Sequence, residues 1–267
     1  MPEKLIQAAY ASIVASWRAQ NIQTRDSLAQ ALDGYRVRFS YHSGRIENAN
    51  ITYHDTRSVF EDGRIVGYTG DVHTLFEMQN LKECHELMLD AFSRRVPITE
   101  ELALSFHRVL TQGTYDEERW KAGEWPGEYK HGDYVVGIHD SGCAPSQVSA
   151  EMNALFAELE AATRENILTV ASYFHLAFES IHPFADGNGR CGRALMNYLL
   201  LLYDHPPVVI YNEDKLAYFG AIELWETEGD LEPMKAFLAA ETVKTWKRTN
   251  LDKRPRVICQ GRLSALS

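Results

Sequence analysis

Residues 166–202 constrain the fold more than any other part of the sequence. Apolar residues between positions 170 and 181 recur with a period of 3.6, which predicts a helix over 166–181. A loop rich in glycine and arginine follows, and the apolar run 194–202 predicts a second, buried helix that ends at His205-Pro206-Pro207. The sequence therefore predicts two buried helices joined by a polar loop.

The loop contains a pattern that is ambiguous when taken alone. Gly187–Gly192 reads G-x-G-x-x-G, the fingerprint of dinucleotide-binding folds. In those folds a strand precedes the glycines, whereas here the preceding residues have helical spacing, so we exclude that fold. The chain has no G-x-x-x-x-G-K-[ST] pattern either, which excludes a P-loop nucleotidase. A helix–loop–helix remains, with the second helix directing its positive end at a phosphate.

We expect further helices wherever the same apolar spacing recurs. They are 3–19, 25–40 with an interruption at Gly34, a short helix over 43–48, Asp55 to Gly63, 71–94 capped by Asp71, Thr99 to Gly113, 146–163, 213–227 and 231–248. Residues 114–145 break this pattern with five glycines, and Tyr134-Val135-Val136 predicts a β-hairpin there, the only sheet we expect. The expected fold class is mainly α, a helical bundle with a small β-hairpin flap.

Composition narrows the possible partners and compartment. A net charge of −10 argues against a general nucleic-acid binder, which needs a basic face. No run approaches the ~20 apolar residues of a membrane span, and polar residues interrupt the N-terminus, so we expect neither a membrane segment nor a signal peptide. The four cysteines form no C-x-x-C pair, which favours a reducing compartment over a structural zinc site. We therefore expect a cytoplasmic protein.

The loop from Ile181 to Arg193 combines residue types that suit nucleotide chemistry. His182 is a proton acceptor, and Asp186 offers oxygen to a divalent cation. Glycines turn backbone N–H groups toward an anion without a Cβ penalty, and Arg190 and Arg193 add positive charge near a helix start. A base, a metal ligand and a phosphate cradle within twelve residues indicate a nucleotide-handling site.

The same stretch resembles the Fic family motif H-x-F-x-[DE]-G-N-G-R-x-x-R at every defined position, from His182 to Arg193. The resemblance extends over roughly residues 40–248. Ser43-Gly44-Arg45-Ile46-Glu47-Asn48 is similar to the inhibitory motif [ST]-x-x-x-E-[GN] of Fic proteins with an N-terminal inhibitory helix. The resemblance implies an N-terminal helical region over 1–70 with the inhibitory helix at about 41–48, a catalytic core over 71–248, and a basic C-terminal tail over 249–267.

The family's activity implies a role for each motif residue. Fic proteins typically transfer AMP from ATP to a Ser, Thr or Tyr hydroxyl of a target protein, with the motif histidine, here His182, as general base. Asp186 would bind Mg²⁺, and Phe184 would anchor the loop in the core. The implied nucleotide-binding residues are Gly187, Asn188, Gly189, Arg190, Arg193, Tyr218 and Thr227, with Tyr211 as a further candidate for the adenine pocket.

Two other segments have implied roles. Glu47, within the motif that Ser43 opens, would pair with Arg193 and so prevent the arginine from binding the γ-phosphate. Tyr134, Val135 and Val136 would form the flap edge that aligns an extended target segment.

Several alternatives stay open at this stage. The resemblance is compatible with another phosphate donor such as UTP or CDP-choline, with removal of AMP from a target, or with a regulatory module that binds nucleotide without transfer. Self-modification and a homodimer are compatible with the family as well. We expect no nucleic-acid or membrane partner.

Overall fold

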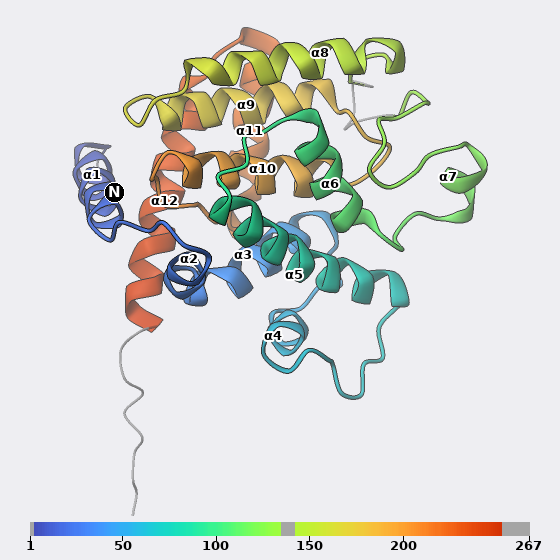
Figure 1. Cartoon of the computed structure of the whole chain (residues 1–267), viewed down its shortest axis with the longest axis horizontal. Coiled ribbons are helices and arrows are strands. Elements are labelled where there is room, and N and C mark those ends of the chain that lie inside the picture. Colours follow the sequence, from blue (N-terminus) through green and yellow to red (C-terminus); the bar gives the residue numbers. More distant parts are fainter. Residues whose placement is uncertain (1–2, 135–141, 253–267) are drawn as a thin grey trace, which may run out of the picture.

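The computed structural model describes residues 3–134 and 142–252, and this part of the chain contains helices and no strand (Figure 1). The longer helices are α1 (Glu3–Arg18), α2 (Arg25–Ala31), α3 (Asp33–Glu47), α4 (Tyr53–Asp62), α5 (Val72–Ser93), α6 (Glu100–Thr111), α8 (Pro145–Glu158), α9 (Ile167–Ile181), α10 (Asn188–Leu202), α11 (Lys215–Glu228) and α12 (Glu232–Asp252). The five-residue α7 (Glu117–Lys121) and the 3₁₀ turns η1 (Leu159–Ala161) and η2 (Asn212–Asp214) complete the set. The predicted mainly α fold is confirmed.

The predicted β-hairpin flap is not seen in the described residues. Tyr134 is the last described residue before the gap and has no strand pairing, and its hydroxyl donates a hydrogen bond to Glu124 over 2.8 Å. Val135 and Val136 lie outside the described residues.

The helix expected over 25–40 divides two residues earlier than predicted. The break falls at Leu32, which separates α2 from α3, and α3 then runs through Gly34 to Glu47 without interruption. A glycine inside a helix costs about 1 kcal/mol, but α3 buries Tyr35, Phe39 and Ile46 in the core, which outweighs that cost. The segment 43–48 is therefore the end of a long helix and not a separate short one.

The helix caps agree with the sequence in most places. Asp71 and Thr99 cap α5 and α6, and Gly63 and Gly229 end α4 and α11 in the left-handed conformation. At α4 the predicted cap is wrong by three residues. Thr52 is the N-cap, and its hydroxyl oxygen accepts from the backbone N–H of Asp55.

The pair α9 and α10 forms the centre of the molecule (Figure 1). Residues 190–201 of α10 are all buried, because α10 packs against α9 and also against α3, α5 and α6. Helices α8 and α12 pack against α9. Packed helices thus hold the 182–187 loop at both ends, which fixes its position.

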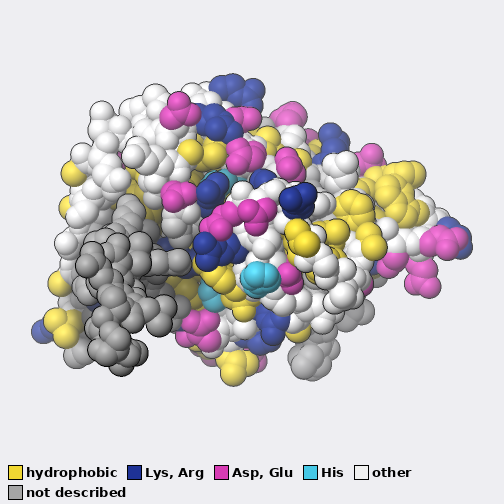
Figure 2. All heavy atoms as spheres, turned by 90° about the horizontal axis from the view of Figure 1, so that it is seen from below, with side chains coloured by type: hydrophobic (Ala, Val, Ile, Leu, Met, Phe, Trp, Pro, Cys, Tyr) yellow, Lys and Arg dark blue, Asp and Glu magenta, His cyan; other side chains and the backbone are white. Residues whose placement is uncertain are grey.

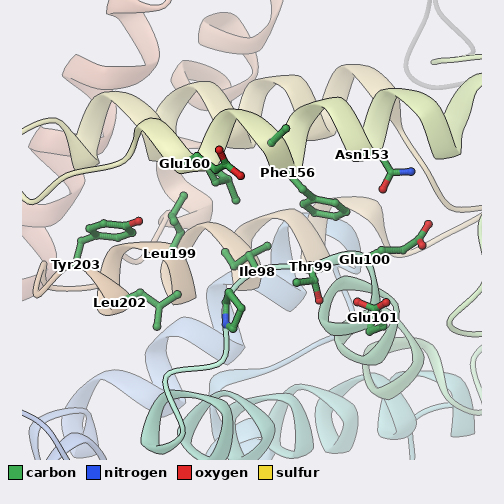
Figure 3. A pocket seen from close by; sticks show the side chains of 13 residues that line it. Ile98, Thr99, Glu100, Glu101, Asn153, Phe156, Glu160, Leu199, Leu202 and Tyr203 are labelled. Carbon is green, nitrogen blue, oxygen red and sulfur yellow. The ribbon is translucent and has the colours of Figure 1, made fainter.

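Two surface features lie outside this centre. A groove of about 540 Å³ opens between the start of α6, α8 and the end of α10, and none of the predicted site residues lines it (Figure 3). One face of the molecule shows acidic and basic side chains interspersed, without a broad area of one sign (Figure 2). Among the described helices, none has both the length and the apolar character that crossing a bilayer requires.

Candidate active site

His182 is held in an unusual backbone conformation at the end of α9. Its φ of 50° and ψ of 63° are left-handed, which costs a non-glycine residue free energy and needs support from its surroundings. The backbone N–H of Cys143 donates to the Ile181 carbonyl over 2.9 Å. A Cβ at Gly142 would lie 2.7 Å from the Cβ of His182, so only glycine permits this approach. Gly142 and Cys143 therefore hold the backbone of His182, the predicted base, in this conformation.

The imidazole of His182 is neutral near pH 7. Burial, with a smaller effect of the Lys130 ammonium, lowers its pKa to about 4, against the opposing effects of the Glu179 backbone and two nearby carboxylates. A neutral imidazole has a nitrogen lone pair available to accept a proton.

The loop after His182 is fixed by the side chain of Asn188. Its Oδ1 accepts from the backbone N–H of Phe184 over 2.9 Å, and its Nδ2 donates to the Phe184 carbonyl over 2.7 Å. Phe184 is fully buried, as predicted for a core anchor. Both polar atoms of the Asn188 side chain are thus bonded to the loop backbone. The backbone N–H of Asn188, at the start of α10, is the group that could donate to an anion.

His107 on α6 is a site residue that our sequence reasoning missed. Its ring stacks on Phe184 with centroids 3.6 Å apart, and its Nδ1 accepts from the backbone N–H of Gly127 over 2.9 Å. That bond places the proton on Nε2, which lies 2.9 Å from the Asp186 carbonyl and donates to it. A histidine between the apolar residues of a helix was the only available signal.

Asp186 and the N-terminus of α10 form the anion-facing part of the site. Gly187 has a φ of 80°, and its N–H donates to Oδ1 of Asp186 over 2.7 Å. The Asp186 side chain is about one third exposed. Among the described residues, no three His, Cys, Asp or Glu side chains are placed to hold a metal ion together. The partly exposed Asp186 carboxylate could offer oxygen to a Mg²⁺ ion, which usually takes most of its ligands from phosphates and water.

The two motif arginines are both buried, and each has a carboxylate partner from another helix. Nη1 of Arg190 lies 2.8 Å from Oε1 of Glu77 on α5, with both side chains under 5% exposed. Glu77 is a second residue that the sequence reasoning missed. It lies within the predicted helix over 71–94, where a single glutamate gave no signal.

Arg193 contacts the end of α3 through three hydrogen bonds. Its Nε donates to the Ser43 hydroxyl over 3.0 Å, and its Nη2 donates to the Ser43 carbonyl over 2.9 Å and to Oε1 of Glu47 over 2.7 Å. Burial alone would lower the pKa of Arg193, but the negative charge of Glu47, with Tyr218 and Glu179, raises it above its ordinary value. Ser43, Glu47 and Arg193 are therefore in contact, which is the pairing that the family resemblance implies.

Gly189 shows where the Glu47 carboxylate lies. A Cβ at Gly189 would stand 2.4 Å from Oε1 of Glu47 and 2.8 Å from Nη1 of Arg193. The carboxylate therefore lies directly over the first turn of α10. The positive end of the α10 dipole stabilises a negative group in that position. A phosphate bound at this helix N-terminus would occupy the same place.

The candidate adenine-pocket residues lie in different surroundings. Tyr218 is fully buried beside Arg193, with its hydroxyl 2.8 Å from Nε2 of His175, and burial raises its pKa. Thr227 is exposed on α11, and its hydroxyl donates to the Glu223 carbonyl of the same helix. Tyr218 thus adjoins the arginine, whereas Thr227 bonds within its own helix.

Comparison with known proteins agrees with this geometry. Residues 97–200, which include His107, His182 and the start of α10, match the model of the Fic/DOC family. Residues 97–200 are a Fic/DOC domain. The chain is also 29% identical over 228 residues to a protein of Drosophila persimilis named "Protein adenylyltransferase Fic", an alignment that covers 82% of this chain and 43% of the relative.

Solved Fic structures share the fold. A Fic domain containing signaling protein from Bacteroides thetaiotaomicron has a TM-score of 0.75 at 23% identity, covering 90% of this chain and 95% of that one. A Fic family protein from Desulfovibrio desulfuricans has a TM-score of 0.72 at 24% identity, covering 95% of this chain and 76% of that one. The Fic fold therefore extends beyond residues 97–200. The chain spans less than half the length of the Drosophila relative that it matches.

Proposed function

We propose that this chain is a protein adenylyltransferase that Glu47 holds inactive. The observation that carries the proposal is the Glu47 carboxylate, which lies 2.7 Å from Arg193 and over Gly189 at the start of α10. A triphosphate needs the same arginine and the same helix end. The name of the Drosophila relative, protein adenylyltransferase, supports transfer of AMP to a protein. The match to the Fic/DOC family supports ATP as the donor of that AMP.

The reaction would use the site residues as follows. His182, neutral at pH 7, takes the proton of a target Ser, Thr or Tyr hydroxyl. The hydroxyl oxygen forms a bond to the α-phosphorus of ATP, and the bond from that phosphorus to the bridging oxygen breaks, so that pyrophosphate leaves. The backbone N–H groups at the start of α10, with Arg190 and Arg193, hold the phosphates by charge and position. When bound at Asp186, Mg²⁺ would offset part of the phosphate charge.

The domain organisation is part of this proposal. Residues 1–70 hold the inhibitory helix, which is the end of α3, and 71–248 form the catalytic core, which contains the matched residues 97–200. The basic tail over 249–267 lies almost entirely outside the described residues. Tyr134, Val135 and Val136 remain the proposed flap edge, and Tyr218 and Thr227 the proposed adenine-pocket residues. Self-modification and a homodimer remain compatible with this proposal.

The inhibitory role is tested by transfer of label from α-labelled ATP to the protein itself and to a cell lysate. Glu47→Gly should increase transfer at least about tenfold over wild type, since ~1.4 kcal/mol of lost competition for Arg193 is enough for that factor. Glu83→Gly is the control, because Glu83 is exposed in the interior of α5, where glycine costs at least as much helix stability as at Glu47, the last residue of α3. Equal transfer by Glu47→Gly and wild type would contradict inhibition by Glu47.

The base is tested in the active background. Adding His182→Ala to Glu47→Gly should reduce transfer by about 10²-fold or more, the usual contribution of a general base. Transfer that persists in the double variant would remove His182 from that role.

The same assay separates the alternatives. The mass added to a modified protein distinguishes AMP from UMP or phosphocholine, and loss of label from a premodified target reveals AMP removal. Absence of any product from Glu47→Gly with every nucleotide tested would favour a nucleotide-binding regulatory module.

A further inference from the structure

Glu77 contacts two functional segments at once. It lies on α5, is 3% exposed, and its Oε1 accepts the hydrogen bond from Nη1 of Arg190 over 2.8 Å. Its other oxygen, Oε2, accepts from Nδ2 of Asn48 over 2.6 Å. One buried carboxylate therefore joins the first motif arginine to the residue that follows Glu47.

Asn48 fixes the end of α3 through its remaining bonds. Its backbone N–H donates to the Gly44 carbonyl over 2.8 Å, which closes the last turn of the helix. Its Nδ2 also donates to the Thr74 hydroxyl over 2.9 Å, and its Oδ1 accepts from the backbone N–H of Asn50 over 2.9 Å. Because Glu47 directly precedes Asn48, these bonds determine where the Glu47 carboxylate points.

Arg190 depends on the same carboxylate. The guanidinium is 3% exposed, its Nη1 is bound to Glu77, and its Nη2 lies 3.7 Å from Oδ1 of Asp186. A buried guanidinium needs a hydrogen-bonded anion, and because the group is planar, a charge-assisted bond at Nη1 restricts the directions that its other N–H groups can take. With Nη1 bound to Glu77, Nη2 is the nitrogen that lies toward Asp186 in the loop. Nδ1 of His73, a half-exposed residue on α5, lies 3.6 Å from Oε2 of Glu77.

We propose that Glu77 is a positioning residue that orients Arg190 toward the phosphates and, through Asn48, orients Glu47 toward Arg193. The inhibitory segment, residues 43–48, is then attached to the active site at two points: Glu47 to Arg193, and Asn48 through Glu77 to Arg190. The catalytic half of this inference rests on the proposed function, whereas the physical coupling of Asn48 to Glu77 does not.

The coupling is tested without nucleotide by hydrogen exchange of the peptide that contains residues 43–48. Asn48→Ala and Glu77→Gln should each accelerate exchange at the end of α3 by about tenfold, because each removes the charge-assisted bond that holds it. The double variant should exchange no faster than the faster single variant, since both remove the same bond. Glu83→Gln, an exposed position on the same helix, should leave exchange unchanged.

Two results would overturn the coupling. One is unchanged exchange in Asn48→Ala, which is only partly buried and carries no charge, and which therefore serves as the test if Glu77→Gln fails to fold. The other is an additive increase in the double variant.

The positioning of Arg190 is tested by kinetics in the Glu47→Gly background. Glu77→Gln should lower kcat/KM for ATP about tenfold, mostly through a higher KM, because Arg190 loses its fixed orientation. An unchanged or increased kcat/KM would mean that Glu77 does not position Arg190. In the chain with Glu47 intact, Asn48→Ala should raise transfer severalfold, and unchanged transfer would contradict control of Glu47 through Asn48.

These outcomes separate the two proposals. If Glu47→Gly forms no product with any nucleotide, the proposed function fails while the exchange result still decides the coupling. If Glu47→Gly is active and exchange in Asn48→Ala is unchanged, only the coupling fails.

Discussion

His107 is a single side chain that fixes both segments bordering the site. It bonds the backbone of Gly127 before the flap and of Asp186 in the motif loop, and it stacks on Phe184. Burial lowers its pKa to about 3, so the ring stays neutral and keeps one acceptor and one donor at physiological pH. Its contribution is positional, since it touches the backbone of the loop and not the base.

At the residue scale we predict that His107→Phe destabilises the protein by about 2–6 kcal/mol. Phenylalanine keeps the stack on Phe184 but leaves the buried Gly127 N–H and Asp186 carbonyl without partners, each worth about 1–3 kcal/mol. Urea denaturation measures the change in the free energy of unfolding. His54→Phe, on the exposed face of α4, is the control and should change it by less than about 0.5 kcal/mol. A similar loss in both variants would contradict this role.

At the scale of the element, α10 depends on the glycine that precedes it. Gly187 is the N-cap of α10 with a φ of 80°, and a Cβ there would lie 2.5 Å from Cγ2 of the buried Thr111. Gly229, which ends α11, has a φ of 69° but nothing within 4 Å of an added Cβ. The two glycines share the conformation and differ in the space around them.

This difference gives a prediction for the pair of alanine variants. Gly229→Ala should cost about 1–2 kcal/mol from the left-handed backbone alone. Gly187→Ala should cost at least ~1 kcal/mol more, because Thr111 must move within a packed core. Both values come from urea denaturation. Equal losses would show that the loop yields freely, which would contradict a rigid phosphate cradle.

At the scale of the whole molecule, buried ionisable groups make stability depend on pH. Burial lowers the pKa to about 3 or 4 for five histidines: His85, His107, His175, His182 and His205. Burial also raises the pKa of Glu179 and Glu241 to about 7. Between pH 6.5 and 4.5 the unfolded chain thus binds five histidine protons that the folded chain does not, and the folded chain binds two glutamate protons that the unfolded chain does not.

We therefore predict that stability falls as the pH is lowered from 7 to 5. The histidines contribute stability that is present above pH 6.5 and is lost toward pH 4, and the two glutamates oppose them in the same window. A net uptake of three protons on unfolding corresponds to at most about 4 kcal/mol per pH unit. Urea denaturation at pH 7, 6 and 5 measures the slope. A flat or opposite slope would mean that the histidines titrate normally in the folded state.

The sequence by itself determined the local elements and the chemistry of the motif. Helical spacing predicted nearly every long helix, and Asp71, Thr99, Gly63 and Gly229 marked ends that the structure confirms. These features are local, since a cap or an apolar stripe depends on residues a few positions apart. The helix break lies at Leu32 and not at Gly34 as predicted, because long-range packing of α3 outweighed the cost of a glycine inside the helix.

Only the tertiary structure decided what the motif residues contact. No pattern in the sequence around Arg190 and Arg193 predicts which carboxylate each arginine contacts. The Glu47 contact was expected from resemblance alone, and the Glu77 and His107 contacts were not expected at all. Such contacts join positions about 80 to 150 residues apart, and their free energy comes from burying complementary groups together. No local pattern encodes that pairing, because it exists only once the helices have packed.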